Sequence, residues 1–147
     1  MRRQTGKIGE KQDGASLLEF SLVAFMFIIV MLGVAEMGRM LLVYTTIADA
    51  ARAGVRYAIV HGGDRSSGAS GPGSTTNVVT VVQNYSSIGL MKTTNPPLTV
   101  AVSYPNGNAA GQPVQVTVTY VYDPLVSWFS SKLNVTMGST SKGIIVY

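Results

Sequence analysis

The 147-residue sequence contains no cysteine, a single histidine and a single tryptophan, and charged residues make up only 12% of it. Without cysteine the chain can form neither disulfides nor thiolate metal sites. Soluble domains usually carry about 25% charged residues, so the low charge indicates a membrane or exported protein rather than a cytosolic enzyme. Catalytic dyads, metal-ligand clusters and phosphate-binding glycine loops are not recognisable. We therefore expect no catalytic residues, no metal, no cofactor and no enzymatic activity.

The basic residues do not indicate a nucleic-acid partner. The net charge is +4, but no stretch interleaves bases with stacking aromatics, as single-strand binding surfaces do. Four bases gather instead near the start, at Arg2, Arg3, Lys7 and Lys11, and they make residues 1–14 a polar, basic leader.

A long apolar run follows this leader. Residues 20–35 carry no charge, and the 20 residues from Ala15 to Val34 span about 30 Å as a helix, which matches the hydrocarbon thickness of a bilayer. The run is longer than the roughly 7–15 apolar residues of a cleaved secretory signal. We therefore predict a single transmembrane helix over 15–35. The bases before it place the N-terminus in the cytoplasm and the rest of the chain outside.

The helical pattern continues beyond the predicted span. No proline occurs from Glu36 to Val60, and apolar residues recur at spacings of three and four. The predicted apolar face consists of Tyr44, Ile47, Ala48, Ala51, Val55, Ala58 and Ile59. Asp49 and Arg52 are spaced to form an i, i+3 ion pair. The pattern predicts a helix continuation over 36–61, ended by glycines, and then a flexible Gly/Ser linker over 62–77.

An α+β region is predicted over 78–147. Thr75 or Thr76 is expected to cap a short helix that runs to Ser86 and buries Val78, Val79 and Val82. The period then changes to two, with inward residues expected at Leu98, Val100, Val102 and Tyr104, at Val114, Val116, Val118, Tyr120 and Tyr122, and at Leu133, Val135 and Met137. Asp123-Pro124 ends the second run. The protruding half of the long helix is expected to cover this small antiparallel sheet.

The start of the apolar run resembles the processing site of type IV prepilins. Residues 14–20 read GASLLEF. In that family a basic leader ends in glycine, a prepilin peptidase cleaves after it, and glutamate is the fifth residue of the mature chain. The resemblance implies cleavage between Gly14 and Ala15, with Glu19 in the fifth position. Glu19 followed by Phe20 is similar to the tight-adherence (Tad/Flp) branch.

Two further stretches resemble TadE-like proteins, which are pseudopilins or minor pilins of the Tad pilus. They are EMGR at 36–39 and AARAGVRYA at 50–58. The residues that match are Glu36, Gly38, Arg39, Ala51, Arg52, Gly54, Arg56 and Tyr57. YDPL at 122–125 fits the family only in pattern. The resemblance implies a pilin-like fold, an inner-membrane location or a place in a pilus, and other pilins and Tad assembly proteins as partners.

Each of these residues also has a plainer interpretation. An ionised carboxylate in lipid costs about 2.5–3.5 kcal/mol at mid-span, so Glu19 is expected to pair with the Ala15 amine of a neighbouring subunit in a helix–helix oligomer. Near the end of a helix, however, Glu19 could instead interact with the helix dipole and reach water. Glu36 and Arg39 can simply mark the end of the span, and Arg52 and Arg56 can form a solvated face.

The alternative function is an uncleaved bitopic anchor whose outer domain scaffolds an envelope complex.

Overall fold

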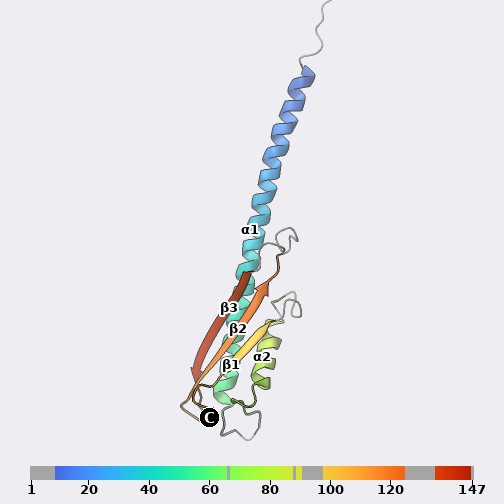
Figure 1. Cartoon of the computed structure of the whole chain (residues 1–147). Helices are drawn as coiled ribbons and strands as arrows, with labels where there is room; N and C mark the ends of the chain where they lie inside the picture. Colours follow the sequence, from blue (N-terminus) through green and yellow to red (C-terminus); the bar gives the residue numbers. More distant parts are fainter. Residues whose placement is uncertain (1–8, 66, 88, 91–97, 125–134, 147) are drawn as a thin grey trace, which may run out of the picture. The chain divides into compact units, whose positions relative to one another are not determined.

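The structure is a computed structural model and describes residues 9–65, 67–87, 89–90, 98–124 and 135–146. Its elements are α1 (Gly9–Val60), α2 (Thr76–Ser86), β1 (Thr99–Ser103), β2 (Pro113–Tyr122) and β3 (Val135–Ile144), as Figure 1 shows. A long N-terminal helix with a small three-stranded antiparallel sheet confirms the predicted α+β, pilin-like fold class. The chain divides into two compact units, Met1–Gly38 and Arg39–Tyr147, which are described separately.

The first unit contains the N-terminal part of α1. The helix begins at Gly9 rather than at Ala15, so Gly14 lies inside it. From Leu17 to Val34 its large apolar side chains are exposed. By length and composition, α1 is the one helix in the described part of the chain that could cross a membrane. The leader residues Arg2, Arg3 and Lys7 lie outside the described residues, as does the side chain of Lys11.

The second unit is built on a sheet in the order β1-β2-β3, with both pairs antiparallel. The central strand β2 alternates as predicted and buries Val114, Val116, Val118, Tyr120 and Tyr122. It ends at Tyr122, directly before Asp123-Pro124. Gly107 and Gly111 have φ angles of 87° and 84° in the connection from β1 to β2, a conformation that glycine adopts without steric cost.

The outer strands of the sheet follow the predicted alternation with shallower burial. Leu98, Val100 and Val102 are half-buried against the core, and Tyr104 is buried. In β3, Met137 is buried and Val135 is half-buried, whereas Leu133 lies outside the described residues. The strand ends at Ile144, and Ile145 and Val146 lie beyond it.

The core of the second unit lies between α1, α2 and the sheet. From α1 it receives Val43, Ile47, Ala50, Ala51, Val55 and Ala58, and from α2 it receives Val78 and Val82. The prediction for Tyr44 is wrong, because this side chain is 50% exposed. Apolar residues occur on more than one side of α1. The spacing of these residues in the sequence does not specify which side of the helix packs on the sheet.

The short helix α2 begins at Thr76, with Thr75 as its N-cap residue and Ser86 as its last residue. These bounds confirm the predicted position. The predicted cap chemistry is wrong, because the Thr75 side chain makes no capping hydrogen bond. Val78 and Val82 are fully buried, while Val79 is half-buried at the margin of the core.

The structure differs from the prediction of a flexible linker over 62–77. The backbone N–H of Gly63 donates to the carbonyl oxygen of Asn108 at 2.8 Å, and Asn108 Nδ2 donates to the Ser70 carbonyl oxygen at 3.0 Å. Ser70 donates its backbone N–H and its hydroxyl to the His61 carbonyl oxygen, at 2.7 and 2.8 Å. These bonds attach the segment to the end of α1 and to the β1–β2 connection. Composition did not reveal them, because Asn108 lies 38 residues from Ser70.

Candidate membrane and assembly segment

The residues of the predicted cleavage site lie on the exposed surface of α1 in the first unit. Gly14, Ala15, Glu19 and Phe20 are all exposed, and a Cβ added at Gly14 would meet nothing within 4 Å. Glu19 lies four residues after Ala15, so the two share one side of the helix. Within the described residues, Glu19 has no ion pair or hydrogen bond from its side chain. A helix whose apolar surface is exposed, with one acid on it, is suited to lipid or to contact with other helices.

The small residues of the second motif lie where α1 packs most closely. Ala51 is fully buried, and Gly54 is buried between α2 and β2. A Cβ added at Gly54 would lie 2.5 Å from Val82 Cγ2 and 3.3 Å from Val116 Cγ1. Real Cβ atoms do not approach other carbons this closely, so the observed contact between α1 and α2 requires a glycine at this position.

The two arginines of this motif are exposed on the other side of α1. Arg52 Nη1 lies 2.8 Å from Asp49 Oδ1, which confirms the predicted i, i+3 pair. The Arg52 side chain is 67% exposed, and such solvated pairs contribute at most about 0.5 kcal/mol. Arg56 is exposed one turn later. Both arginines are therefore available to a partner surface.

Tyr57 fixes the end of α1 to the loop that follows it. Its ring stacks on His61, with centroids 3.9 Å apart and planes 7° apart. Its hydroxyl donates to the Gly68 carbonyl oxygen at 3.2 Å, and His61 Nδ1 lies 2.9 Å from the Tyr57 carbonyl oxygen. The Tyr57 side chain is therefore part of the structure of the second unit rather than a free recognition element.

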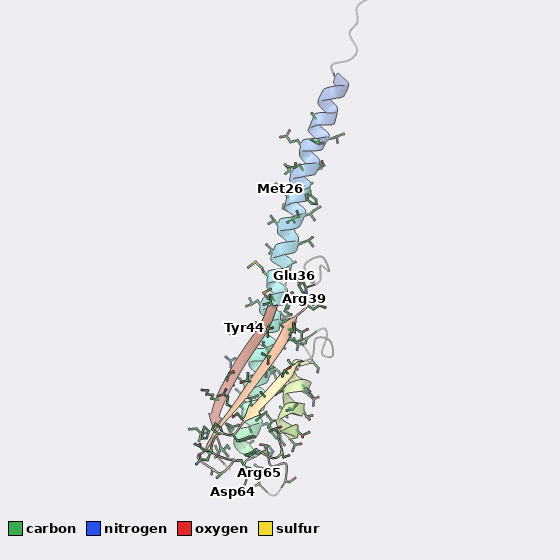
Figure 2. All side chains as sticks on the ribbon, in the orientation of Figure 1. Met26, Glu36, Arg39, Tyr44, Asp64 and Arg65 are labelled. Carbon is green, nitrogen blue, oxygen red and sulfur yellow. The ribbon has the colours of Figure 1, made fainter. Side chains whose placement is uncertain are left out.

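Arg39, the first residue of the second unit, contacts the end of β2. Its guanidinium carbon lies 5.3 Å from the centroid of the Tyr122 ring, within the range of a cation–π contact. Figure 2 labels Arg39 and Glu36 on α1, and both are half-buried. The sequence analysis did not predict the contact between Arg39 and Tyr122. The one indication in the sequence was that Arg39 lies in the EMGR stretch at 36–39 and Tyr122 in the YDPL stretch at 122–125.

Comparison with models of known protein families tests the resemblance. The model of the family described as TadE-like protein matches residues 14–56. The N-terminal segment of the chain is similar to this family. The match begins at Gly14 and ends at Arg56, and it covers 43 of the 147 residues. The apolar helix within the matched segment fits a single-pass membrane protein. Comparison with curated proteins gives no match. Comparison with solved structures gives none either.

The TadE-like segment thus contains the predicted cleavage site, the apolar helix and the close contact at Gly54. The structure does not bring these residues into one cleft, because they are distributed along α1. In the described residues, no group of three or more His, Asp or Glu side chains is placed to hold a metal ion. The arrangement is suited to contact between helices rather than to binding a small ligand.

A polar cluster lies beyond the TadE-like segment, where the loop after α1 meets the sheet. The Tyr104 hydroxyl is buried there and has no hydrogen-bond partner among the described residues. Burial raises the pKa of the Tyr104 phenol above its ordinary value of about 10, and neighbouring Tyr57 raises this pKa further. The nearby Ser70 hydroxyl acts in the opposite direction. Nothing in the sequence pattern indicated this cluster.

Proposed function

We propose that this protein is a TadE-like minor pilin or pseudopilin. It acts as a non-catalytic structural component in the assembly of a Tad/Flp-type pilus or a related secretion system. The observation that carries the proposal is the exposed apolar helix of the first unit, which bears Gly14 and Glu19 in the spacing of a prepilin. The family match over 14–56 supports the same conclusion.

The proposed processing step is cleavage between Gly14 and Ala15 by a prepilin peptidase. Both residues lie within α1, and a peptidase reaches a helical peptide bond only after local opening of the helix. Glycine lowers the cost of that opening, because it is about 1 kcal/mol less favourable than alanine inside a helix. The open space around Gly14 also leaves the scissile bond accessible. Cleavage removes the basic leader and creates a new amine on Ala15.

Glu19 then has a role in assembly. Its carboxylate lies on an apolar surface and finds no partner in the described chain. In lipid such a carboxylate is stabilised by pairing, and the Ala15 amine of a neighbouring mature subunit supplies a positive charge at the same depth. This pairing would fix the relative height of adjacent helices. The partners are other pilins or pseudopilins and Tad assembly proteins.

The proposed location is the inner membrane, with a single span over 15–35. The basic leader stays in the cytoplasm, and the second unit lies on the outer side. After assembly the protein either enters the pilus or stays in the membrane as an assembly factor.

Intact mass spectrometry tests the proposal. The full chain is co-expressed with a prepilin peptidase, and the mature mass is expected to correspond to a start at Ala15. Gly14→Val should retain the leader, whereas Gly33→Val should be processed normally. Gly33 is a matched control, since it is a glycine of the same helix with nothing within 4 Å of an added Cβ. A chain that keeps its leader in the wild-type sequence supports the uncleaved anchor instead.

A second measurement addresses assembly. Glu19→Gln is expected to be cleaved but to lose association with partner pilins and to reduce the yield of sheared filaments. If the Glu19→Gln variant is processed, associates and assembles as the wild type does, the proposed pairing is wrong. Recovery of the protein in sheared filaments identifies a filament subunit, and recovery only in membranes identifies an assembly factor.

A further inference from the structure

The connection from β1 to β2 contains an asparagine that is followed by glycine. These residues are Asn106 and Gly107, and no other asparagine in the sequence precedes a glycine. The backbone turns at this point, because the Gly107 N–H donates to the Tyr104 carbonyl oxygen and Gly107 has a φ of 87°. Asn106 is exposed at the turn. Asparagine is a thermolabile residue, and an exposed Asn-Gly turn favours loss of its side-chain amide.

The structure leaves both reacting groups of this pair accessible. Within the described residues, the Asn106 side chain makes no hydrogen bond. The hydrogen bond from Gly107 N–H to Tyr104 is 3.3 Å long, at the weak limit of N–H···O bonds. A Cβ added at Gly107 would meet nothing within 4 Å, so the space beside this residue is open. Ring closure between the Asn106 side chain and the Gly107 nitrogen therefore breaks only a weak hydrogen bond.

We infer that Asn106 is a site of spontaneous deamidation, and that the modification weakens the attachment of the loop after α1 to Asn108. The inference goes beyond the proposed function and does not depend on it. The Gly107 backbone nitrogen attacks Asn106 Cγ, and a bond forms between these two atoms. The Cγ–Nδ2 bond breaks, and Nδ2 leaves as ammonia with the proton that the Gly107 nitrogen loses. Glycine permits this attack because it has no side chain to obstruct the ring.

Water then opens the cyclic imide at one of its two carbonyl carbons. Attack at Asn106 Cγ gives aspartate. Attack at the Asn106 backbone carbonyl carbon gives isoaspartate, in which the main chain runs through the former side chain. Isoaspartate therefore lengthens the connection by one backbone atom and adds a carboxylate.

The longer backbone lies two residues before Asn108, which holds the loop after α1. The Asn108 carbonyl oxygen accepts from the Gly63 N–H at 2.8 Å, and Asn108 Nδ2 donates to the Ser70 carbonyl oxygen at 3.0 Å. The contact is close, because a Cβ added at Gly71 would lie 2.5 Å from Asn108 Nδ2. Hydrogen bonds weaken steeply when their geometry changes. A displacement of Asn108 therefore weakens both attachments of the loop.

Peptide mapping by mass spectrometry tests the modification. The full chain in detergent is incubated at neutral and at mildly alkaline pH. We expect Asn106 to become a mixture of aspartate and isoaspartate several-fold faster than Asn84, and faster at alkaline pH because the attacking nitrogen must lose its proton. Asn84 is a control matched in exposure, but it lies in α2 and precedes Tyr85. Asn108 is a control from the same connection, and it precedes Ala109. Conversion of Asn106 no faster than that of these two residues would overturn the inference.

Hydrogen exchange of the loop tests the structural consequence. The amides of Gly63 and Ser70 should exchange several-fold faster in the incubated wild type than in the fresh protein. Asn106→Gln is the matched control, because it keeps an uncharged amide but needs a larger ring to cyclise. After the same incubation this variant should exchange at the fresh rate. If the converted wild type exchanges at the fresh rate, or if incubated Asn106→Gln exchanges equally fast, the modification does not release the loop.

Discussion

Replacing Gly54 by alanine tests the closest approach between α1 and α2. The added Cβ would lie 2.5 Å from Val82 Cγ2, whereas carbon atoms in contact are normally about 3.5–4.0 Å apart. Overpacking of this kind costs about 1–3 kcal/mol, and alanine recovers about 0.8–1 kcal/mol of helix propensity. We therefore expect Gly54→Ala to lower the free energy of unfolding of the second unit by about 1 kcal/mol.

Urea unfolding of the full chain in detergent, followed by pulse proteolysis of the second unit, measures this change. The decisive comparison uses Val82→Ala, which removes the methyl group that blocks the new Cβ. In that background, Gly54→Ala should be neutral or should stabilise by up to about 1 kcal/mol, since the propensity gain is then opposed only by the 3.3 Å approach to Val116 Cγ1. Gly38→Ala is the control, because its added Cβ meets nothing within 4 Å. The reasoning fails if Gly54→Ala stabilises the protein with Val82 intact.

Two further substitutions test polar contacts of the second unit. Tyr104→Phe removes a buried hydroxyl without a hydrogen-bond partner among the described residues, and should raise the free energy of unfolding by about 1 kcal/mol at pH 7. Burial raises the pKa of the Tyr104 phenol, so the wild type loses stability as the pH rises above about 10, where the unfolded chain ionises first. The difference in the free energy of unfolding between Tyr104→Phe and the wild type should therefore increase above this pH. A difference that decreases would contradict the raised pKa of Tyr104. Arg39→Met removes the cation–π contact with Tyr122 and should cost about 0.5–2 kcal/mol, whereas Arg52→Ala, which breaks only an exposed pair, should change stability by less than about 0.5 kcal/mol. Equal effects of the two arginine substitutions in the same assay would show that the Tyr122 contact contributes nothing.

The features that follow from local periodicity were predictable from the sequence. The alternation from Val114 to Tyr122 predicted both the span of β2 and its buried face, because a strand buried on one side repeats every two residues. The helix from Thr76 to Ser86 and the Asp49–Arg52 pair are also local and were predicted correctly. The TadE-like recognition rested on short stretches at 14–20, 36–39 and 50–58, and the family match over 14–56 covers the first two and most of the third.

The features that depend on contacts between distant segments were not predictable. Tyr44 was assigned to the core face because its spacing fits Ile47 and Ala51, but Val43 occupies that face instead. The choice between two apolar stripes depends on the position of the sheet, which a helical period does not specify. Arg39 and Tyr122 are 83 residues apart, so their contact appears only in three dimensions. The roles of Gly14 and Glu19 stay predictions.

The position of Ile145 in the core has a consequence for synthesis of the protein. Ile145 is 1% exposed, and the neighbouring Val146 N–H donates to the Ile59 carbonyl oxygen at 2.8 Å. The ribosome adds 84 residues after Val60 before it reaches Ile145, which takes about 4–17 s at about 5–20 residues per second. During this interval the inner face of α1 lacks its complete native cover. Slower synthesis would therefore leave this apolar helix face without its complete cover for longer.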